Sequence, residues 1–368
     1  MPTAAAELVF DEATKVYPGR DGAAVDHLSL TVPAGEICVL VGPSGGGKTT
    51  ALKLVNRLIE LTSGYIRIDG TLIGDYDVTD LRRSIGYVIQ HVGLFPHMTV
   101  EGNIGTVPRL LGWDRKRIRE RVAELLELVG LDPDKDRRRF PAELSGGQRQ
   151  RVGLARALAA NPSLMLMDEP FGAIDPIVRA RLQDEFLRLQ QELRKTVVFV
   201  THDVDEAIKV GDRIAILREG GRLAQYDTPQ RILEQPVDEF VADFVGRDRA
   251  LKALALRKLG ELELSPATGD GLPRLPADTS LRDALALLVA EHRDALVVVG
   301  ADGSPLGVVK REDLLGRAAF APPAARSYRT SARRAPASGI TAGSAPTGCA
   351  RTGATRCSRR SSSTSSSR

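Results

Sequence analysis

Three short, continuously apolar runs lie in the first part of the chain, at residues 37–41 (ICVLV), 164–168 (LMLMD) and 196–200 (TVVFV). Continuous apolar runs are typical of parallel strands that are buried on both faces. Residues 1–35 instead alternate apolar and polar positions, as half-exposed antiparallel strands do. The pattern therefore predicts antiparallel strands first and a buried parallel sheet after them.

Helical periodicity separates these runs. In RKRIRERVAELLELVGL the apolar residues that recur on one helical face are Ile118, Val122, Leu125, Leu126 and Val129. Strands that alternate with helices predict an α/β domain with a mainly parallel sheet. We place this domain at residues 1–240 and a helical linker at 241–256.

The pattern changes again in the last third. Residues 257–317 predict a small α+β unit, with a helix (SLRDALALLVAEHRDA), two strands (LVVVG and LGVVK) around a turn, and a helix start (REDLL). Residues 318–368 are rich in Arg, Ala, Ser and Pro and lack any period, which predicts a disordered tail. We interpret this tail as out-of-frame translation of a GC-rich gene; the alternative is a basic arm that touches anionic lipid.

Charge changes the picture little. The chain carries a net charge of +4, but residues 318–368 hold nine Arg and no Lys, Asp or Glu. Subtracting those nine charges from +4 leaves −5 for residues 1–317, so the basic balance belongs to the tail and predicts no nucleic-acid partner.

No apolar run is long enough to span a membrane, and no secretory signal is evident. Cys38, Cys349 and Cys357 show no metal-type clustering, which indicates a reducing compartment.

Residues 42–49, GPSGGGKT, match the phosphate-loop pattern between a predicted buried strand and a predicted helix. The glycines allow backbone N–H groups to face an anion, and the helix adds the positive end of its dipole. Lys48 then reaches the β- and γ-phosphates, and the Thr49 hydroxyl ligates Mg²⁺. A chance glycine-rich turn is the alternative.

Asp168 and Glu169 stand at the end of the run LMLMD. In a parallel sheet this is the edge where ligands bind. Asp168 suits a Mg²⁺ ligand, held directly or through water, and Glu169 suits a base that orients or deprotonates an attacking water. Without the phosphate loop, two adjacent acids would more often be solvated surface groups.

Residues 144–148, LSGGQ, precede an Ala-, Leu- and Arg-rich helical pattern, with Ser145 as a good N-cap. The turn is either a plain capped helix or a second anion site at a helix N-terminus. Ser145 lies 23 residues before Asp168. With this spacing, the chain resembles the ATP-binding cassette (ABC) ATPases over residues 1–240.

The resemblance implies a P-loop NTPase fold, namely an ABC cassette with a mainly parallel sheet, antiparallel β strands and a helical subdomain. It also implies ATP and Mg²⁺ as cofactors. The implied catalytic residues are Glu169, His202 and Gln90, and the implied metal residues are Thr49, Gln90 and Asp168. The implied ATP contacts are Tyr17, Gly42, Ser44, Gly45, Gly47, Lys48, Thr49, Thr50, Ser145, Gly147, Gln148 and Asp175.

Some of these residues have simpler interpretations. Tyr17 is equally well a strand aromatic. Asp175 precedes Pro176 and is also a good N-cap. His202 taken alone would more often be structural, and Gln90 alone carries no signal.

In the family, two cassettes form a homodimer that holds ATP between the phosphate loop of one subunit and the Ser145–Gly147 turn of the other. One cassette without a membrane span resembles a transporter subunit that lies on the cytoplasmic face of the inner membrane. Its partners would be permease subunits and an extracytoplasmic substrate-binding protein.

The segments VIQHVGLFPHMTVEGNI, MDEPFGAIDPIVR and FVGRDRALKAL resemble importers of quaternary-amine osmoprotectants such as glycine betaine, choline, carnitine or proline betaine. By this resemblance, residues 93–100 lie at the groove for the permease, although Leu94 and Phe95 also suit ordinary packing. The alternatives are the ATPase of an amino-acid or polyamine importer, and a soluble ABC ATPase.

Residues 278–315 resemble one repeat of a CBS domain, which normally occurs in pairs. The family's nucleotide contact has Ser or Thr where this chain has Lys310, three residues before Asp313. We therefore expect a structural role for this stretch in preference to nucleotide binding.

Overall fold

The computed structural model describes residues 4–19, 21–89, 93–172, 175–266 and 271–316. Its first sheet is antiparallel, as the alternating pattern predicts, with the strand order β2-β1-β4-β5. The strands are β1 (Leu8–Val16), β2 (Ala23–Val32), β4 (Ser63–Ile68) and β5 (Thr71–Leu72).

A second, six-stranded sheet has the order β10-β9-β3-β8-β7-β6. Its strands are parallel except for β10, which runs antiparallel to β9. The strands are β3 (Ile37–Val41), β6 (Ile85–Val88), β7 (Leu164–Asp168), β8 (Thr196–Val200), β9 (Arg213–Leu217) and β10 (Leu223–Asp227). Strands β3, β7 and β8 coincide with the three apolar runs, so that prediction is confirmed.

Every residue of β3, β7 and β8 is buried. Successive side chains of a strand point to opposite faces, and β3 shows the result. Val39 and Val41 join one apolar cluster, whereas Cys38 and Leu40 join the other. Burial on both faces is the physical reason for the continuous apolar runs.

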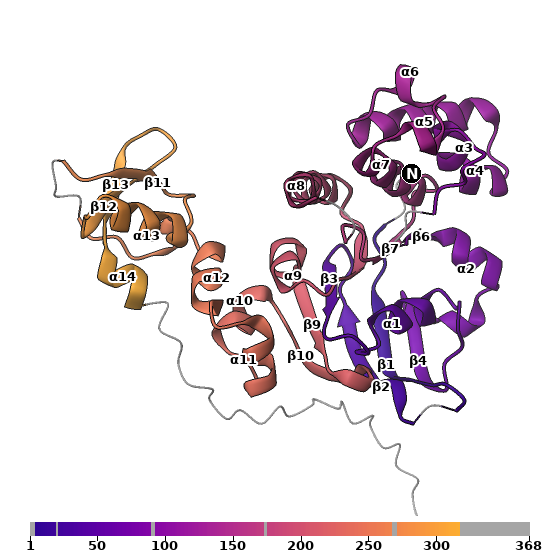
Figure 1. The fold of residues 1–368 in the computed structure, drawn as a ribbon, viewed down its shortest axis with the longest axis horizontal. Coiled ribbons are helices and arrows are strands. Elements are labelled where there is room, and N and C mark those ends of the chain that lie inside the picture. Colours follow the sequence, from indigo (N-terminus) through magenta and orange to yellow (C-terminus); the bar gives the residue numbers. More distant parts are fainter. Residues whose placement is uncertain (1–3, 20, 90–92, 173–174, 267–270, 317–368) are drawn as a thin grey trace, which may run out of the picture. The chain divides into compact units, whose positions relative to one another are not determined.

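Helices cover the parallel sheet, and those from α3 to α7 gather in one group (Figure 1). The helices of this part are α1 (Lys48–Val55), α2 (Val78–Ser84), α3 (Val100–Ile104), α4 (Thr106–Leu110), α5 (Arg115–Leu128), α6 (Pro133–Asp136), α7 (Gly146–Leu158), α8 (Pro176–Leu193), α9 (Val204–Val210) and α10 (Pro229–Glu234). The short 3₁₀ turns are Ile73–Asp75, Pro141–Glu143, Glu219–Gly221 and Leu259–Glu261. The predicted apolar face of α5 is buried in the apolar cluster that contains Val39 and Val41, called the main cluster from here on.

The predicted linker 241–256 is helical in two pieces, α11 (Glu239–Val245) and α12 (Arg249–Leu256). Gly246 separates them with a φ of +95°, a value that favours glycine. Val241, Val245 and Ala253 belong to the main cluster, whereas Leu254 belongs to a third cluster. The linker is therefore packed along its length, and the boundary at residue 240 stays a prediction.

The third cluster is the core of the C-terminal unit, whose sheet has the order β11-β12-β13. Its elements are β11 (Arg274–Pro276), α13 (Leu281–Ala290), β12 (Ala295–Val299), β13 (Pro305–Lys310) and α14 (Arg311–Gly316). The predicted helix–strand–turn–strand–helix order is confirmed. The predicted tail, with its proposed change of reading frame, lies outside the described residues.

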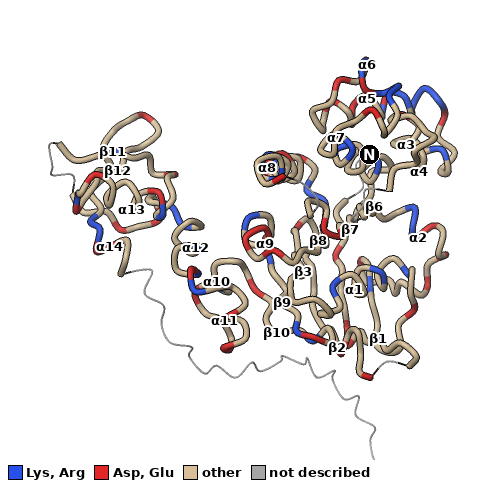
Figure 2. The backbone as a smooth tube through the Cα atoms, viewed as in Figure 1, with Lys and Arg blue, Asp and Glu red and all other residues tan. Residues whose placement is uncertain are grey.

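Charges of both signs are interspersed over the described elements, and α8 shows this clearly (Figure 2). Many of them pair, as Lys209 does with Asp184 at 2.7 Å. In the described part of the chain, no helix is long and apolar enough to cross a bilayer.

Candidate active site

The carboxyl ends of three neighbouring strands form the site. β3, β8 and β7 are adjacent in the sheet. The glycine-rich loop follows β3, Glu169 follows β7, and His202 comes two residues after the end of β8. The strand order therefore gathers groups that are far apart in the sequence, as the position of Asp168 and Glu169 predicted.

These groups surround an open cleft of about 430 Å³, a volume typical of small-molecule sites. Its lining consists of Ala24, Ser44, Gly45, Gly46, Gly47, Lys48, Thr49, Thr50, Glu169 and His202. Sequence reasoning did not single out Gly46 or Ala24. Gly46 lies inside the phosphate-loop pattern, and that position alone was enough to predict it as a residue of the site. Ala24 belongs to β2 in the other sheet, and no local pattern marks it.

Two glycines of the loop are required by close backbone approach. A Cβ on Gly42 would lie 2.3 Å from the carbonyl oxygen of Leu217, and a Cβ on Gly47 would lie 2.1 Å from that of Ala24. Gly47 also has a φ of +73°, which residues with a side chain rarely adopt. The loop can therefore turn tightly between β3 and α1 only with glycine at these positions.

Lys48 is held inside the loop. Its Nζ donates hydrogen bonds to the carbonyl oxygens of Gly42 at 2.7 Å and Pro43 at 2.9 Å. Burial lowers the pKa of this ammonium, while the nearby charges of Glu169 and Asp168 act in the opposite direction. A cation fixed inside a glycine-rich loop is well placed to bind an anion.

Thr49, which lines the cleft, and Asp168 beside it form a pair of possible metal ligands with oxygen atoms. The Thr49 hydroxyl donates to Oδ1 of Asp168 at 2.9 Å. Burial raises the pKa of the Asp168 carboxyl, and the Thr49 hydrogen bond opposes that shift. Within the described ranges no group of three or more His, Cys, Asp or Glu residues forms a metal cage. The pair fits Mg²⁺, which binds few protein oxygens and takes its other ligands from phosphates and water.

Glu169 and His202 contact each other at the mouth of the cleft, with 3.1 Å between Glu169 Oε1 and His202 Nδ1. The backbone of Glu169 has a φ of +46°, a conformation that costs a non-glycine residue about 1–3 kcal/mol. Its N–H donates to the carbonyl oxygen of Val200 at 2.9 Å. This bond to β8 fixes the strained backbone, so the carboxylate projects into the cleft from a rigid support.

Other predicted site residues are not among those that line this cleft. Tyr17 follows the end of β1, with the Lys15 ammonium 5.2 Å from its ring centroid. Asp175 is exposed and N-caps α8 through bonds from Ile177 and Val178, so its structural interpretation is confirmed. Gln90 lies outside the described residues.

The Ser145 turn is also absent from the lining. Ser145 caps α7 in a capping box: its Oγ accepts from the Gln148 N–H at 3.2 Å, and the Gln148 side chain accepts from the Ser145 N–H at 3.0 Å. Ser145 is exposed and Gly147 is partly exposed. The turn is thus a helix N-terminus fixed by a capping box, and it is not part of the lining of the chain's own cleft.

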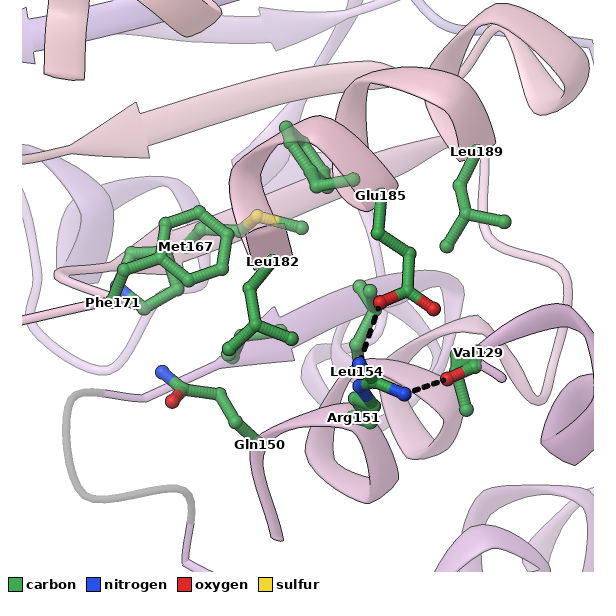
Figure 3. Close-up of a pocket in the computed structure, with 12 residues that line it drawn as sticks. Val129, Gln150, Arg151, Leu154, Met167, Phe171, Leu182, Glu185 and Leu189 are labelled. Carbon is green, nitrogen blue, oxygen red and sulfur yellow. Dashed lines mark hydrogen bonds and ion pairs between the residues drawn. The ribbon is translucent and has the colours of Figure 1, made fainter. Parts of the chain in front are cut away.

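A second cavity lies beside α7 and α8 (Figure 3). It measures only about 30 Å³ and is mostly apolar, with Phe171 and Leu182 among its lining. Arg151 closes one side, donating to the carbonyl oxygen of Val129 at 3.3 Å and pairing with Glu185 at 3.1 Å. One water would nearly fill this space, so it is a packing gap and not a ligand site.

In the C-terminal unit, residues 307–313 are the stretch that was considered for nucleotide contact, and its polar groups pair within the unit. Asp313 accepts a hydrogen bond from the Lys310 backbone N–H at 3.1 Å. At Gly307, an added Cβ would lie 2.5 Å from the Leu264 side chain, and Ser265 forms a bridge with Val308. This side of β13 is therefore covered by residues 264–265, which supports the structural interpretation.

A phosphate loop beside Asp168, Glu169 and His202 on a mainly parallel sheet defines a P-loop nucleotide-binding cassette. The model of the ABC transporter family matches residues 25–172, and that of the CBS domain matches residues 270–319. Over 306 residues the chain is 49% identical to the osmoprotectant import ATP-binding protein OsmV of Salmonella typhimurium, covering 82% of this chain and 79% of that protein.

The choline transport ATP-binding protein OpuBA of Bacillus subtilis is 48% identical, with 79% and 75% of the two chains covered. Among solved structures, the ATP-binding cassette MJ0796, a dimer bound to ADP and Pi, matches with a TM-score of 0.54. It is 33% identical and the match covers 60% of this chain and 98% of that one. The chain belongs to the ABC transporter ATPases, in the group that contains the osmoprotectant import ATP-binding proteins.

Proposed function

We propose that this chain hydrolyses ATP to drive import of a quaternary-amine osmoprotectant through a separate membrane permease. One observation carries the proposal: Lys48, Thr49, Glu169 and His202 line one cleft, and the Thr49 hydroxyl is bonded to Asp168. The 49% identity to an osmoprotectant import protein supports the transported class.

Binding of the nucleotide rests on the loop. Lys48 would leave the carbonyl groups of Gly42 and Pro43 to contact the β- and γ-phosphates, because a charged partner makes a stronger bond than a neutral one. Thr49 and Asp168 would hold Mg²⁺, which neutralises charge on the phosphates. Tyr17 would stack on the adenine from the end of β1.

Hydrolysis rests on Glu169 and His202. The Glu169 carboxylate accepts a proton from a water whose oxygen attacks the γ-phosphorus. The bond from that phosphorus to the oxygen it shares with the β-phosphate breaks, which yields ADP and inorganic phosphate. His202, 3.1 Å from Glu169, orients the carboxylate and reaches the γ-phosphate. Gln90 would complete the metal site from the segment outside the described residues.

A homodimer completes the site. The Ser145 turn, with Gly147 and Gln148, is a capped helix N-terminus that does not line the cleft of its own chain, and such an end binds anions well. A second subunit would place this turn on the γ-phosphate, with Asp175 at the contact between subunits. The dimeric state of the MJ0796 cassette supports this arrangement.

The permease would dock at residues 93–100. The side chain of Asn103 holds this segment in place: its Oδ1 accepts from the Phe95 N–H at 2.7 Å, and its amide donates to three backbone carbonyls of the segment. Leu94 packs on the main cluster, whereas Phe95 is 41% exposed. A rigid loop that presents an aromatic ring suits a helix of a membrane partner.

The chain would thus act on the cytoplasmic face of the inner membrane, with a substrate-binding protein delivering the osmoprotectant on the other side. The test is reconstitution in liposomes with the permease subunits of an osmoprotectant importer from the same organism, measuring ATPase activity with glycine betaine, choline, carnitine and proline betaine across ionic strengths. We expect stimulation by at least one of them. Stimulation only by spermidine or glutamine would contradict the substrate class, and no ATP hydrolysis in any condition would contradict the motor.

A further inference from the structure

The loop that carries His202 runs directly into α9. Asp203 caps this helix, with its Oδ1 accepting from the N–H groups of Asp205 at 2.9 Å and Glu206 at 3.2 Å. The Asp203 N–H in turn donates to the Thr201 hydroxyl at 3.0 Å. The residues on both sides of His202, Thr201 and Asp203, are therefore hydrogen-bonded to each other, and Asp203 is tied to the first turn of α9.

One side chain of that turn, Glu206, is buried against α8. Its residue is 6% exposed, and its Oε1 accepts from Nε2 of Gln183, which is also 6% exposed, at 3.0 Å. The Thr201 side chain hydrogen-bonds the same carboxyl. Burial raises the pKa of Glu206, and these two hydrogen bonds oppose the shift. A buried polar group that loses its partner is costly, so the Glu206–Gln183 contact strongly restrains the two helices.

A second link joins the same elements. Arg179 of α8 lies 3.8 Å from Asp203, one turn before Gln183 on the helix that Asp175 caps. By contrast, the pair between Asp184 and Lys209, which also joins α8 to α9, is exposed at the surface. Exposed pairs contribute little to rigidity, so the buried contact is the polar link that most restrains α9 on α8, in addition to the apolar packing of Ala207 and Val210.

We propose that Glu206, bonded to Gln183, is a positioning residue that holds the start of α9 on α8 and thereby keeps His202 beside Glu169. The inference rests on the proposed hydrolysis of ATP. It assigns to two buried residues outside every recognised motif a role in the chemical step, without any contact to the nucleotide.

The test compares steady-state ATP hydrolysis by the full chain and its variants. Glu206→Ala is expected to lower kcat roughly 10- to 100-fold, the range for a misplaced catalytic group, while KM for ATP changes less than about twofold because the phosphate loop is untouched. Glu206→Gln keeps an oxygen for Gln183 and should restore most of the rate. Asp184→Ala, which removes only the exposed link between the same helices, is the matched control and should hydrolyse normally.

A double-mutant cycle separates positioning from general damage. If Glu206 acts through His202, then Glu206→Ala should cause little further loss in a His202→Ala background. Equal losses in both backgrounds would overturn the proposal, as would a normal kcat in Glu206→Ala. If Glu206→Ala fails to fold by circular dichroism, Gln183→Ala decides, and a normal kcat there overturns the proposal. An inactive wild-type chain would instead overturn the proposed function.

Discussion

The cassette and the C-terminal unit use the same local devices to different ends. Both contain a strand that leads into a loop with glycine, and both contain a helix capped by serine. In the cassette, Lys48 and Thr49 border a cleft of about 430 Å³. In the C-terminal unit, Asp313 is bonded to the neighbouring Lys310 N–H, and residues 264–265 cover β13. A motif thus becomes a site only where the fold leaves space in front of it.

The largest expected effect is confined to the cassette. Glu169→Gln removes the proton acceptor but keeps the shape, so we expect ATP hydrolysis to fall about 10²- to 10⁴-fold while ATP binding persists. ATP-locked dimers should then accumulate in size-exclusion chromatography. Glu127→Gln, which changes an exposed acid on α5, is the control. Unchanged hydrolysis in Glu169→Gln would remove Glu169 from its role.

Truncation of core side chains tests whether the cassette and the C-terminal unit unfold separately. Leu166 of β7 and Leu296 of β12 are both fully buried, each in its own apolar cluster. Each Leu→Ala change should lower the free energy of unfolding of its region by about 2–5 kcal/mol. Urea titrations followed by ATPase activity should show an early loss for Leu166→Ala and a normal midpoint for Leu296→Ala.

Leu306→Ala, at a 51% exposed position, serves as the control and should change little. A loss of ATPase activity at low urea in Leu296→Ala would show that the cassette depends on the C-terminal core.

Two serine caps give a smaller and more specific comparison. Ser145 accepts from the Gln148 N–H at 3.2 Å, and Ser280 accepts from the Asp283 N–H at 3.1 Å. Replacing either by Ala should cost about 1 kcal/mol in unfolding free energy, since each loses one cap. Only Ser145→Ala should also slow ATP hydrolysis. Equal rates for both variants would leave Ser145 as a plain cap.

The smallest expected effect is at Asp313. The Asp313 carboxylate accepts a hydrogen bond from the Lys310 N–H. Asp313→Ala should therefore leave the binding of AMP and ATP by the full chain unchanged, as measured by isothermal titration calorimetry. The matched change Lys48→Ala should abolish the ATP signal. A loss of AMP binding in Asp313→Ala would show that the C-terminal unit binds a nucleotide after all.

Much of this fold is predictable because burial on both faces of the sheet requires continuous apolar runs, which are seen at residues 37–41, 164–168 and 196–200. The edge of the sheet was predictable too, since strand ends and glycine loops are local features. The position of Ala24 beside Gly47 was not, because it depends on packing between two sheets. The same holds for Glu206 and Gln183, which look like ordinary helical residues until α8 and α9 are packed together.

Cys38 is the second residue of β3, the strand that leads into the phosphate loop, and is fully buried. Burial raises the pKa of its thiol to about 12, and the thiolate is the form that reacts with alkylating reagents. With Cys349 and Cys357 replaced by serine, the rate at which an alkylating reagent labels Cys38 would measure how often the central sheet opens. The labelling rate reflects local opening of β3. Ligands that bind only the closed sheet would slow the labelling in proportion to their affinity.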